Sequence, residues 1–292
     1  MTSAAFQQLT PSLWVTQSPF FATNSGIFMG AGQACLIDPG ITPEEIRGIA
    51  RFVLEQGAAV QALILTHSHW DHLLGPEHFP GAKVITQLEY KNSVAQHGEA
   101  ILQQVSRWET QANILRSQPF TLPRPTLAFE SRLYLMGGDH TLQLLPAPGH
   151  AADQLVIYEA TTGMLWAADM LSDVEIPFVS HSLSAYEETL ARLATLDVRV
   201  LIPGHGAPTA IPAEIQARFD ADRSYLKTLR ERVRAAIADG KTLAETVALC
   251  ADIPFHHPEG NAGPHRLNVE SVFVELGGAV EAPPVGWQRE EG

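Results

Sequence analysis

Apolar residues in the first 90 positions form short runs separated by turns that contain glycine or proline, a pattern typical of buried strands. Thr42-Pro43-Glu44-Glu45 predicts the start of a helix, with Thr42 as its N-cap and an end near Gly57. This alternation of strand, helix and strand indicates an α/β protein. The strands expected in this part of the chain are 13–15, 26–29, 34–38, 62–65 and 83–86.

The remainder of the chain continues the alternation and then becomes helical. A mostly helical stretch is expected over 89–117, followed by strands at 126–135 and 141–145 that are joined by a glycine-containing hairpin turn at 137–140. Further strands are expected at 154–158, 164–168 and 198–202, with a helix at 182–196. After residue 207 the pattern predicts helices over 213–239, 243–250 and 265–276, with a loop from 255 to 264.

The composition is that of a soluble globular protein, with 292 residues, 45% hydrophobic and 17% charged. The net charge of −13 argues against a nucleic-acid partner. The N-terminus lacks the features of a signal peptide, and no apolar run approaches the ~20 residues that cross a bilayer. We therefore expect no membrane association and a cytoplasmic location. Cys35 and Cys250 are expected to be buried free thiols, with a disulfide between them left open.

A dense group of candidate metal ligands follows the apolar strand at 62–65. In Thr66-His67-Ser68-His69-Trp70-Asp71-His72, four residues able to bind a metal fall within six positions. Alternate side chains of an extended segment share a face, so His67 and His69 can reach one ion together. A turn after them would direct Asp71 and His72 towards a second ion. Imidazole and carboxylate ligands suit zinc, iron or manganese.

The segment Thr66–His72 resembles the signature of the metallo-β-lactamase-fold hydrolases, which implies a further His, an Asp and a last His downstream. Candidates occur in that order: His150 in Pro148-Gly149-His150, Asp169 after an apolar strand, and His205 in Pro203-Gly204-His205. Taken singly, each Pro-Gly-His could be an ordinary turn, and Asp169 could be a helix N-cap. Their joint order after the histidine cluster is what points to one shared site.

The resemblance implies an αββα four-layer sandwich of the α/β class. It would comprise a catalytic domain over 1–210 and a helical C-terminal extension over 211–281 packed on it, with a disordered tail over 282–292. It also implies two divalent metal ions, zinc first, with iron or manganese as alternatives. His67, His69 and His150 would hold one ion, and Asp71, His72 and His205 the other. Asp169 would bridge the two.

The activity implied by the resemblance is hydrolysis of an ester, thioester or lactone in a small-molecule substrate. A metal-bridging hydroxide would attack the carbonyl, and Asp71 would be the catalytic residue that orients this nucleophile or carries a proton. A bridging Asp169 resembles glyoxalase II-like thioesterases and lactonases, and disfavours a true β-lactamase. The alternatives are a mononuclear iron persulfide dioxygenase and a non-catalytic metal- or ligand-binding member of the fold. A homodimer is left open.

A few other residues allow two interpretations. Asp38 is expected to be a turn-former before Pro39, although a place beside the metals is the alternative. Ordinary packing competes with a pocket-lining role for Trp70 and Phe178, and His181 is a third pocket candidate. The histidines outside the motifs are expected to be surface or turn residues; these are His97, His140, His256 and His257.

Overall fold

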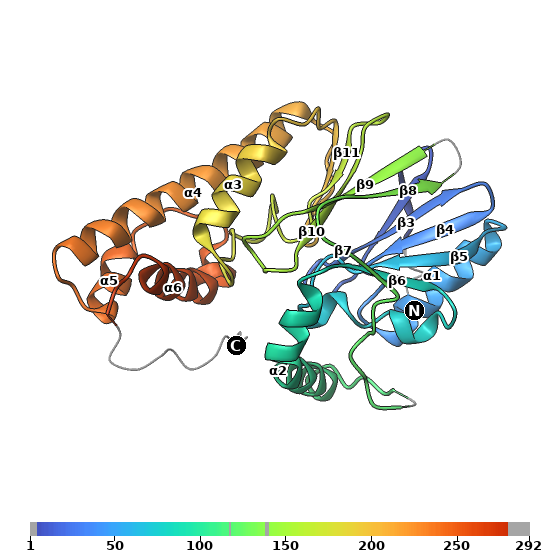
Figure 1. The fold of residues 1–292 in the computed structure, drawn as a ribbon, viewed down its shortest axis with the longest axis horizontal. Helices are drawn as coiled ribbons and strands as arrows, with labels where there is room; N and C mark the ends of the chain where they lie inside the picture. The colour runs from blue at the N-terminus through green and yellow to red at the C-terminus, as the bar shows by residue number, and fades with distance from the viewer. Residues whose placement is uncertain (1–4, 117, 138–139, 280–292) are drawn as a thin grey trace.

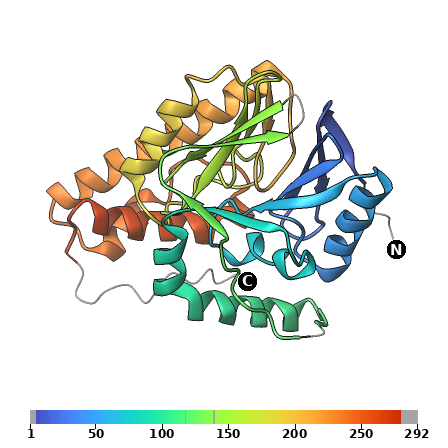
Figure 2. The ribbon, with the colours of Figure 1, turned by 45° about the vertical axis from the view of Figure 1, so that its right-hand side comes forward.

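Two mixed β-sheets lie face to face in the centre of the molecule, and helices cover the outer face of each sheet (Figures 1 and 2). The computed structural model describes residues 5–279 except 117, 138 and 139. The arrangement confirms the predicted αββα sandwich with a helical C-terminal region.

The first sheet contains the N-terminal strands in sequence order. Its strands are β1 (Gln7–Thr10), β2 (Leu13–Gln17), β3 (Asn24–Gly30), β4 (Gln33–Ile37), β5 (Ala59–Ile64), β6 (Lys83–Gln87) and β7 (Leu127–Phe129). The second sheet has the order β12 (Val200–Ile202), β11 (Met164–Trp166), β10 (Leu155–Glu159), β9 (His140–Pro146) and β8 (Leu133–Gly137). Strands β4 to β7 run parallel, as do β11 and β12, so the carboxyl ends within each of these groups meet at one edge.

Both faces of the central strands are buried, which explains why they are nearly continuous apolar runs. On β5, Leu63 packs under the outer helices, whereas Ile64 faces the second sheet. On β10, Ile157 faces the first sheet and Val156 packs under the C-terminal helices. Three apolar layers result, one between the sheets and one on each outer face.

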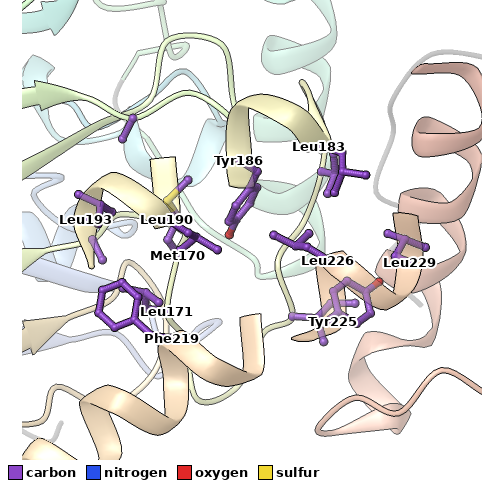
Figure 3. Close-up of a cluster of buried hydrophobic side chains, with 14 of the residues drawn as sticks. Met170, Leu171, Leu183, Tyr186, Leu190, Leu193, Phe219, Tyr225, Leu226 and Leu229 are labelled. Carbon is purple, nitrogen blue, oxygen red and sulfur yellow. The ribbon is translucent and has the colours of Figure 1, made fainter. Parts of the chain in front are cut away.

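The helices divide between the two outer faces. The first sheet is covered by α1 (Pro43–Glu55) and α2 (Tyr90–Gln111), and the second by α3 (Leu183–Leu193) and α4 (Pro212–Ala238). Helices α5 (Leu243–Cys250) and α6 (Pro258–Glu275) pack against α4. Two short 3-10 turns, η1 (Trp70–His72) and η2 (Pro76–His78), follow β5. Helix α1 begins as predicted, because Thr42 and Glu45 form a capping box. Figure 3 shows α3 and α4 packed through Tyr186, Leu190, Phe219 and Leu226.

The structure differs from the sequence expectations at three places. The strand predicted over 126–135 is two strands in different sheets, since β7 pairs with β6 and β8 pairs with β9. Helix α2 ends at Gln111 rather than near residue 117. Helix α6 begins at Pro258, seven residues before its predicted start, and contains Pro264.

Other expectations are met or stay open. Cys35 and Cys250 are free thiols, as expected. Within the described residues, no helix has the length and apolar character needed to span a bilayer. The domain boundary at residue 210 and the cytoplasmic location stay predictions. The centre of the predicted hairpin turn at 138–139 and the predicted tail at 282–292 lie outside the described residues.

Candidate metal centre

The four segments that carry the predicted ligands meet at one edge of the sandwich. Strand β5 leads into His67, β9 into His150, β11 into Asp169 and β12 into His205. Backbone hydrogen bonds join the two sheets at this edge, from Leu155 N to Thr66 O (2.8 Å) and from Asn24 N to Gly204 O (2.7 Å). The structure therefore brings all seven predicted side chains into one cluster, in which His69 is half-buried and the other six are buried.

The first group of ligand atoms consists of three imidazole nitrogens around one oxygen of Asp169. His67 Nε2 lies 3.5 Å and His150 Nε2 lies 3.2 Å from Asp169 Oδ2. His69 Nδ1 lies 2.9 Å from His150 Nε2. These four atoms all lie within 4.8 Å of one another, a spacing that suits ligands of a single ion.

The second group lies around the other oxygen of Asp169. His72 Nε2 is 3.2 Å and His205 Nε2 is 3.6 Å from Asp169 Oδ1. Asp71 Oδ2 completes this group, at 3.2 Å from His205 Nε2. Each oxygen of the Asp169 carboxylate thus faces a separate ligand group, which is the geometry required of a bridging ligand.

Asp38 lies behind the histidine cluster and orients it. Its Oδ2 accepts from His72 Nδ1 at 2.9 Å and from Thr66 Oγ1 at 2.6 Å, and its Oδ1 accepts from Thr66 N at 2.8 Å. The Thr66 hydroxyl also lies 3.1 Å from His67 Nδ1. These contacts engage Nδ1 of His67 and His72 and leave Nε2 of each ring facing the site. Hydrogen-bond partners of metal-binding histidines fix the ring orientation in the same way. The interpretation of Asp38 as only a turn-former is wrong.

Backbone carbonyls orient two further histidines. His150 Nδ1 lies 2.9 Å from Phe178 O, and His205 Nδ1 lies 2.9 Å from Phe21 O. Because a carbonyl only accepts, each Nδ1 donates its proton to the backbone, and Nε2 is the nitrogen that faces the site.

The donor set and its burial fit a pair of cations. Among the described residues, His67 Nε2 and both oxygens of Asp169 are buried without a hydrogen-bond partner. Such atoms cost free energy unless something else satisfies them, and a divalent cation on each side of Asp169 would do so. Burial lowers the pKa of His67 to about 4, so the imidazole is neutral and able to bind a metal at neutral pH.

Nearby carboxylates stabilise positive charge in the second group of ligand atoms, which contains His72 and His205. Burial alone would lower the pKa of His205, but the surrounding carboxylates, Glu175 first, raise it to about 10. In the same way, burial acts to lower the pKa of His72, but Asp169 and Asp71 raise it well above its usual value. A divalent cation would replace these protons with a stronger and fixed positive charge.

Two glycines are required where the Pro-Gly-His segments enter the site. Gly149 has φ +145° and contacts Tyr186 so closely that an added Cβ would overlap the backbone of α3. A Cβ on Gly204 would overlap Asp169 Oδ1. The glycines therefore allow the following histidines to approach the cluster.

The sequence did not reveal every residue near the centre. Glu175, six positions after Asp169, has a carboxylate oxygen within 4.8 Å of ligand atoms of Asp169 and His205, and no motif marks it. The position of Asp38 could have been found from its place at the end of β4, which runs parallel to β5.

The other candidate residues fall into two groups. Trp70 is buried between Phe21 and Trp108, and Phe178 packs against the ring of His150, so packing explains both. His97, His181 and His257 are exposed, and His140 is the first residue of β9. The half-buried His256 is not a simple surface residue, because its Nε2 lies 2.8 Å from Glu175 O.

Comparisons with known proteins identify the fold and the family. Over 73% of this chain and 77% of the relative, the sequence is 27% identical to a probable metallo-hydrolase, YqjP, of Bacillus subtilis (strain 168). The fold is similar to that of a stereoselective inverting sec-alkylsulfatase, Pisa1, from Pseudomonas sp. (TM-score 0.76, 20% identity, 96% of this chain). The chain spans about half of that enzyme, 51% of its length.

A metallo-beta-lactamase family protein from Thermus thermophilus is similar over nearly the whole of both chains, 92% of this one and 93% of the other. The TM-score is 0.68 and the identity 23%. Residues 18–205, more than half of the chain and including every predicted ligand, match the family model itself. The chain therefore belongs to the metallo-beta-lactamase superfamily.

Proposed function

We propose that this protein is a dinuclear metal-dependent hydrolase that acts on an ester, thioester or lactone in a small molecule. The observation that carries the proposal is the Asp169 carboxylate, whose two buried oxygens accept no hydrogen bond from the described residues and face separate groups of ligand atoms. Membership of the superfamily supports hydrolysis in general, and the class of bond is our inference from the bridging carboxylate.

The residues that would hold the ions follow from the two groups. His67, His69 and His150 would hold one ion and Asp71, His72 and His205 the other, with Asp169 shared. Bound divalent ions roughly 3.5–4 Å apart lower the pKa of a water molecule and polarise a carbonyl oxygen. Every ligand is an imidazole or a carboxylate, a set that zinc, iron and manganese can all accept. Zinc is the first candidate because catalytic zinc sites are commonly built from these two ligand types.

Asp71 is the candidate catalytic residue among the chain's own groups. Burial alone would raise its pKa, but His72 and His205 beside it lower the pKa overall, so the side chain is a carboxylate at neutral pH. A fixed carboxylate at this position accepts a hydrogen bond from an attacking water and orients it, which is the positioning that general base catalysis requires. The hydrogen bonds behind His72, His150 and His205 keep the surrounding imidazoles from rotating.

The test combines metal analysis with a substrate panel. Protein purified without chelators should contain two metal ions per chain and should hydrolyse a member of a panel of thioesters, lactones and carboxylic and sulfate esters. The variant His69→Ala should stay folded and lose at least about 100-fold in activity, since loss of even an outer partner of a ligand costs 10–100-fold. The same substitution at the exposed His97 is the matched control and should leave turnover unchanged.

Other results would overturn the proposal. Metal-free protein without hydrolysis of any substrate would favour a non-catalytic member of the fold. One iron per chain with oxygen consumption on a persulfide would favour the dioxygenase. Normal turnover in folded His69→Ala would show that the cluster is not the active site.

A further inference from the structure

The segment 174–179 lies between the metal centre and the C-terminal helices. On one side, Phe178 O accepts a hydrogen bond from His150 Nδ1 at 2.9 Å, and Ser180 Oγ donates to His150 O. On the other side, the segment contacts side chains of α6 and of the loop before it. The orientation of His150 therefore depends on how this segment is held.

Asn268 on α6 holds the peptide group that contacts His150. Its Oδ1 accepts from Val179 N at 2.7 Å, and its Nδ2 donates to Pro177 O at 2.7 Å. Val179 N and Phe178 O belong to the same planar peptide group. Asn268 and His150 consequently bind opposite ends of one peptide unit, and hydrogen bonds in such a chain polarise and strengthen one another.

The side chain of Asn268 is itself fixed. It is fully buried, and its second Nδ2 hydrogen is donated to Tyr225 OH at 2.9 Å. That hydroxyl contacts His265 Nδ1 at 2.9 Å, and His265 Nε2 contacts Cys250 O at 2.9 Å. Rotating the amide would place its oxygen against Pro177 O, so the network allows a single orientation. Figure 3 shows Tyr225 on α4, next to the core that joins this helix to α3.

A second asparagine of α6 holds the beginning of the same segment. Asn261 Nδ2 donates to Val174 O at 3.0 Å, and its Oδ1 accepts from Ile176 N at 3.4 Å. His256 Nε2 contacts Glu175 O at 2.8 Å. The backbone of the segment is thus bound along its length by side chains that lie outside the part of the chain matched by the family model.

We propose that Asn268 is a positioning residue of the metal centre, which sets the orientation of His150 through the Phe178–Val179 peptide group. The inference rests on the proposed function in one respect, that His150 is a metal ligand. It assigns to α6 a role in metal affinity, in addition to its role in packing.

The test measures zinc affinity rather than turnover, by competition with a chelating dye, and uses the absorption spectrum of the cobalt(II)-loaded protein as a second readout. Asn268→Ala should lower the affinity for one of the two zinc ions about tenfold, as loss of an outer partner of a ligand does. The affinity for the other ion should be unchanged. The cobalt spectrum should change for the same ion. Thr246→Val on α5 is the matched control, because it removes a buried hydrogen bond of the C-terminal helices, from Thr246 Oγ1 to Thr242 O, that involves neither Asn268 nor the segment.

Each result decides for or against the proposal. Unchanged zinc affinity in folded Asn268→Ala, or an equal loss of affinity in Thr246→Val, would overturn it. If Asn268→Ala does not fold, Asn261→Ala replaces it. A loss of affinity for only one of the two zinc ions is again expected. A wild-type chain that binds two zinc ions but hydrolyses no substrate would overturn the hydrolase and leave this inference standing. A wild-type chain that binds no zinc would overturn both.

Discussion

Asp38 has a left-handed backbone conformation, with φ +43°, at the point where β4 ends. Few side chains adopt this conformation readily, and aspartate and asparagine are among those that do. The same conformation directs the carboxylate towards His72 Nδ1, 2.9 Å away. Asp38 therefore both forms the turn after β4 and supports the histidine cluster.

We expect Asp38→Asn to weaken metal binding while preserving the fold. Asparagine keeps the backbone conformation but places an amide N–H against either Thr66 or His72, both of which donate to Asp38. The affinity for the ion held by His72 should fall about 10- to 100-fold. Elemental analysis and zinc competition measure this loss, with Asp220→Asn on the exposed face of α4 as control. Full metal occupancy with wild-type affinity would contradict the role of Asp38.

Asp222 is a buried carboxyl outside the cluster, and it should make stability depend on pH. It accepts from Leu171 N at 3.0 Å, and burial raises its pKa to about 7, against ~3.9 in an unfolded chain. The folded chain keeps a proton that the unfolded chain releases as the pH rises from about 4 to about 7. The carboxyl therefore lowers stability progressively across that window.

Asp222→Asn should consequently be more stable than wild type at pH 8, because the amide oxygen still accepts from Leu171 N without a titratable proton. About three pH units at ~1.4 kcal/mol each gives an upper limit of about 4 kcal/mol for the gain. Near pH 4 the two proteins should differ little. Urea unfolding at both pH values measures the difference, and a difference that does not grow with pH would refute the assignment.

At the scale of elements, local signals predicted the helices and strands whose ends are determined locally. The capping box at Thr42 located the start of α1, and Ser182 caps α3 as the predicted range implied. The continuous apolar runs located β3 to β6. Strands that are buried on both faces are apolar along most of their length, so their positions can be read directly from these runs.

The errors occur where tertiary contacts decide the element. Residues 126–135 are predicted as one strand, but nothing in the local pattern shows that β7 joins the first sheet and β8 the second. The Gly/Asn/Pro-rich segment before residue 265 reads as a loop because its helix propensity is low. Asn261 nevertheless donates a hydrogen bond to Val174 O and accepts one from Ile176 N, and these bonds hold the segment as the first turns of α6.

The candidate site was predictable where it is formed by particular side chains, and not where it depends on backbone groups. The spacing from His67 to His72 and the two Pro-Gly-His segments are visible in the sequence, and the structure brings them together. Phe178 and Phe21 orient ligands through their carbonyl groups, which every residue possesses, so no residue type could have identified them. That the seven side chains bind metal stays a prediction.

At the scale of the whole molecule, the predicted boundary at residue 210 crosses a continuous core. One apolar cluster contains Leu145 and Val156 of the second sheet, Leu190 of α3, Phe219 of α4 and Val272 of α6. Figure 3 shows the α3 and α4 members of this cluster in contact. The helices after residue 210 therefore pack against the core of the second sheet and α3. They also supply Asp222 as the acceptor for Leu171 N and Asn268 as the acceptor for Val179 N.

We expect a chain truncated after residue 210 to fail to fold cooperatively. Exposing buried side chains such as Leu183, Leu190 and Leu193 costs roughly 1.5–3 kcal/mol each. Three of them alone account for about 5–9 kcal/mol, comparable with the whole ~5–15 kcal/mol that stabilises a typical domain. In addition, Leu171 N and Val179 N would lose the acceptors that Asp222 and Asn268 provide.

Size-exclusion chromatography and thermal unfolding followed by circular dichroism would distinguish the two outcomes. The control is a chain truncated after residue 279, which keeps α4, α5 and α6 and should unfold cooperatively as a well-behaved species. Aggregation or non-cooperative melting of the 1–210 chain alone would mean that the C-terminal helices are part of one folding unit with the sheets. If the 1–210 chain were instead a soluble species with a cooperative transition and bound two zinc ions with the affinity of the full chain, residue 210 would mark an independent domain. The packing of α4 and α6 would then be dispensable, and the proposed role of Asn268 in metal affinity would be wrong for the same reason.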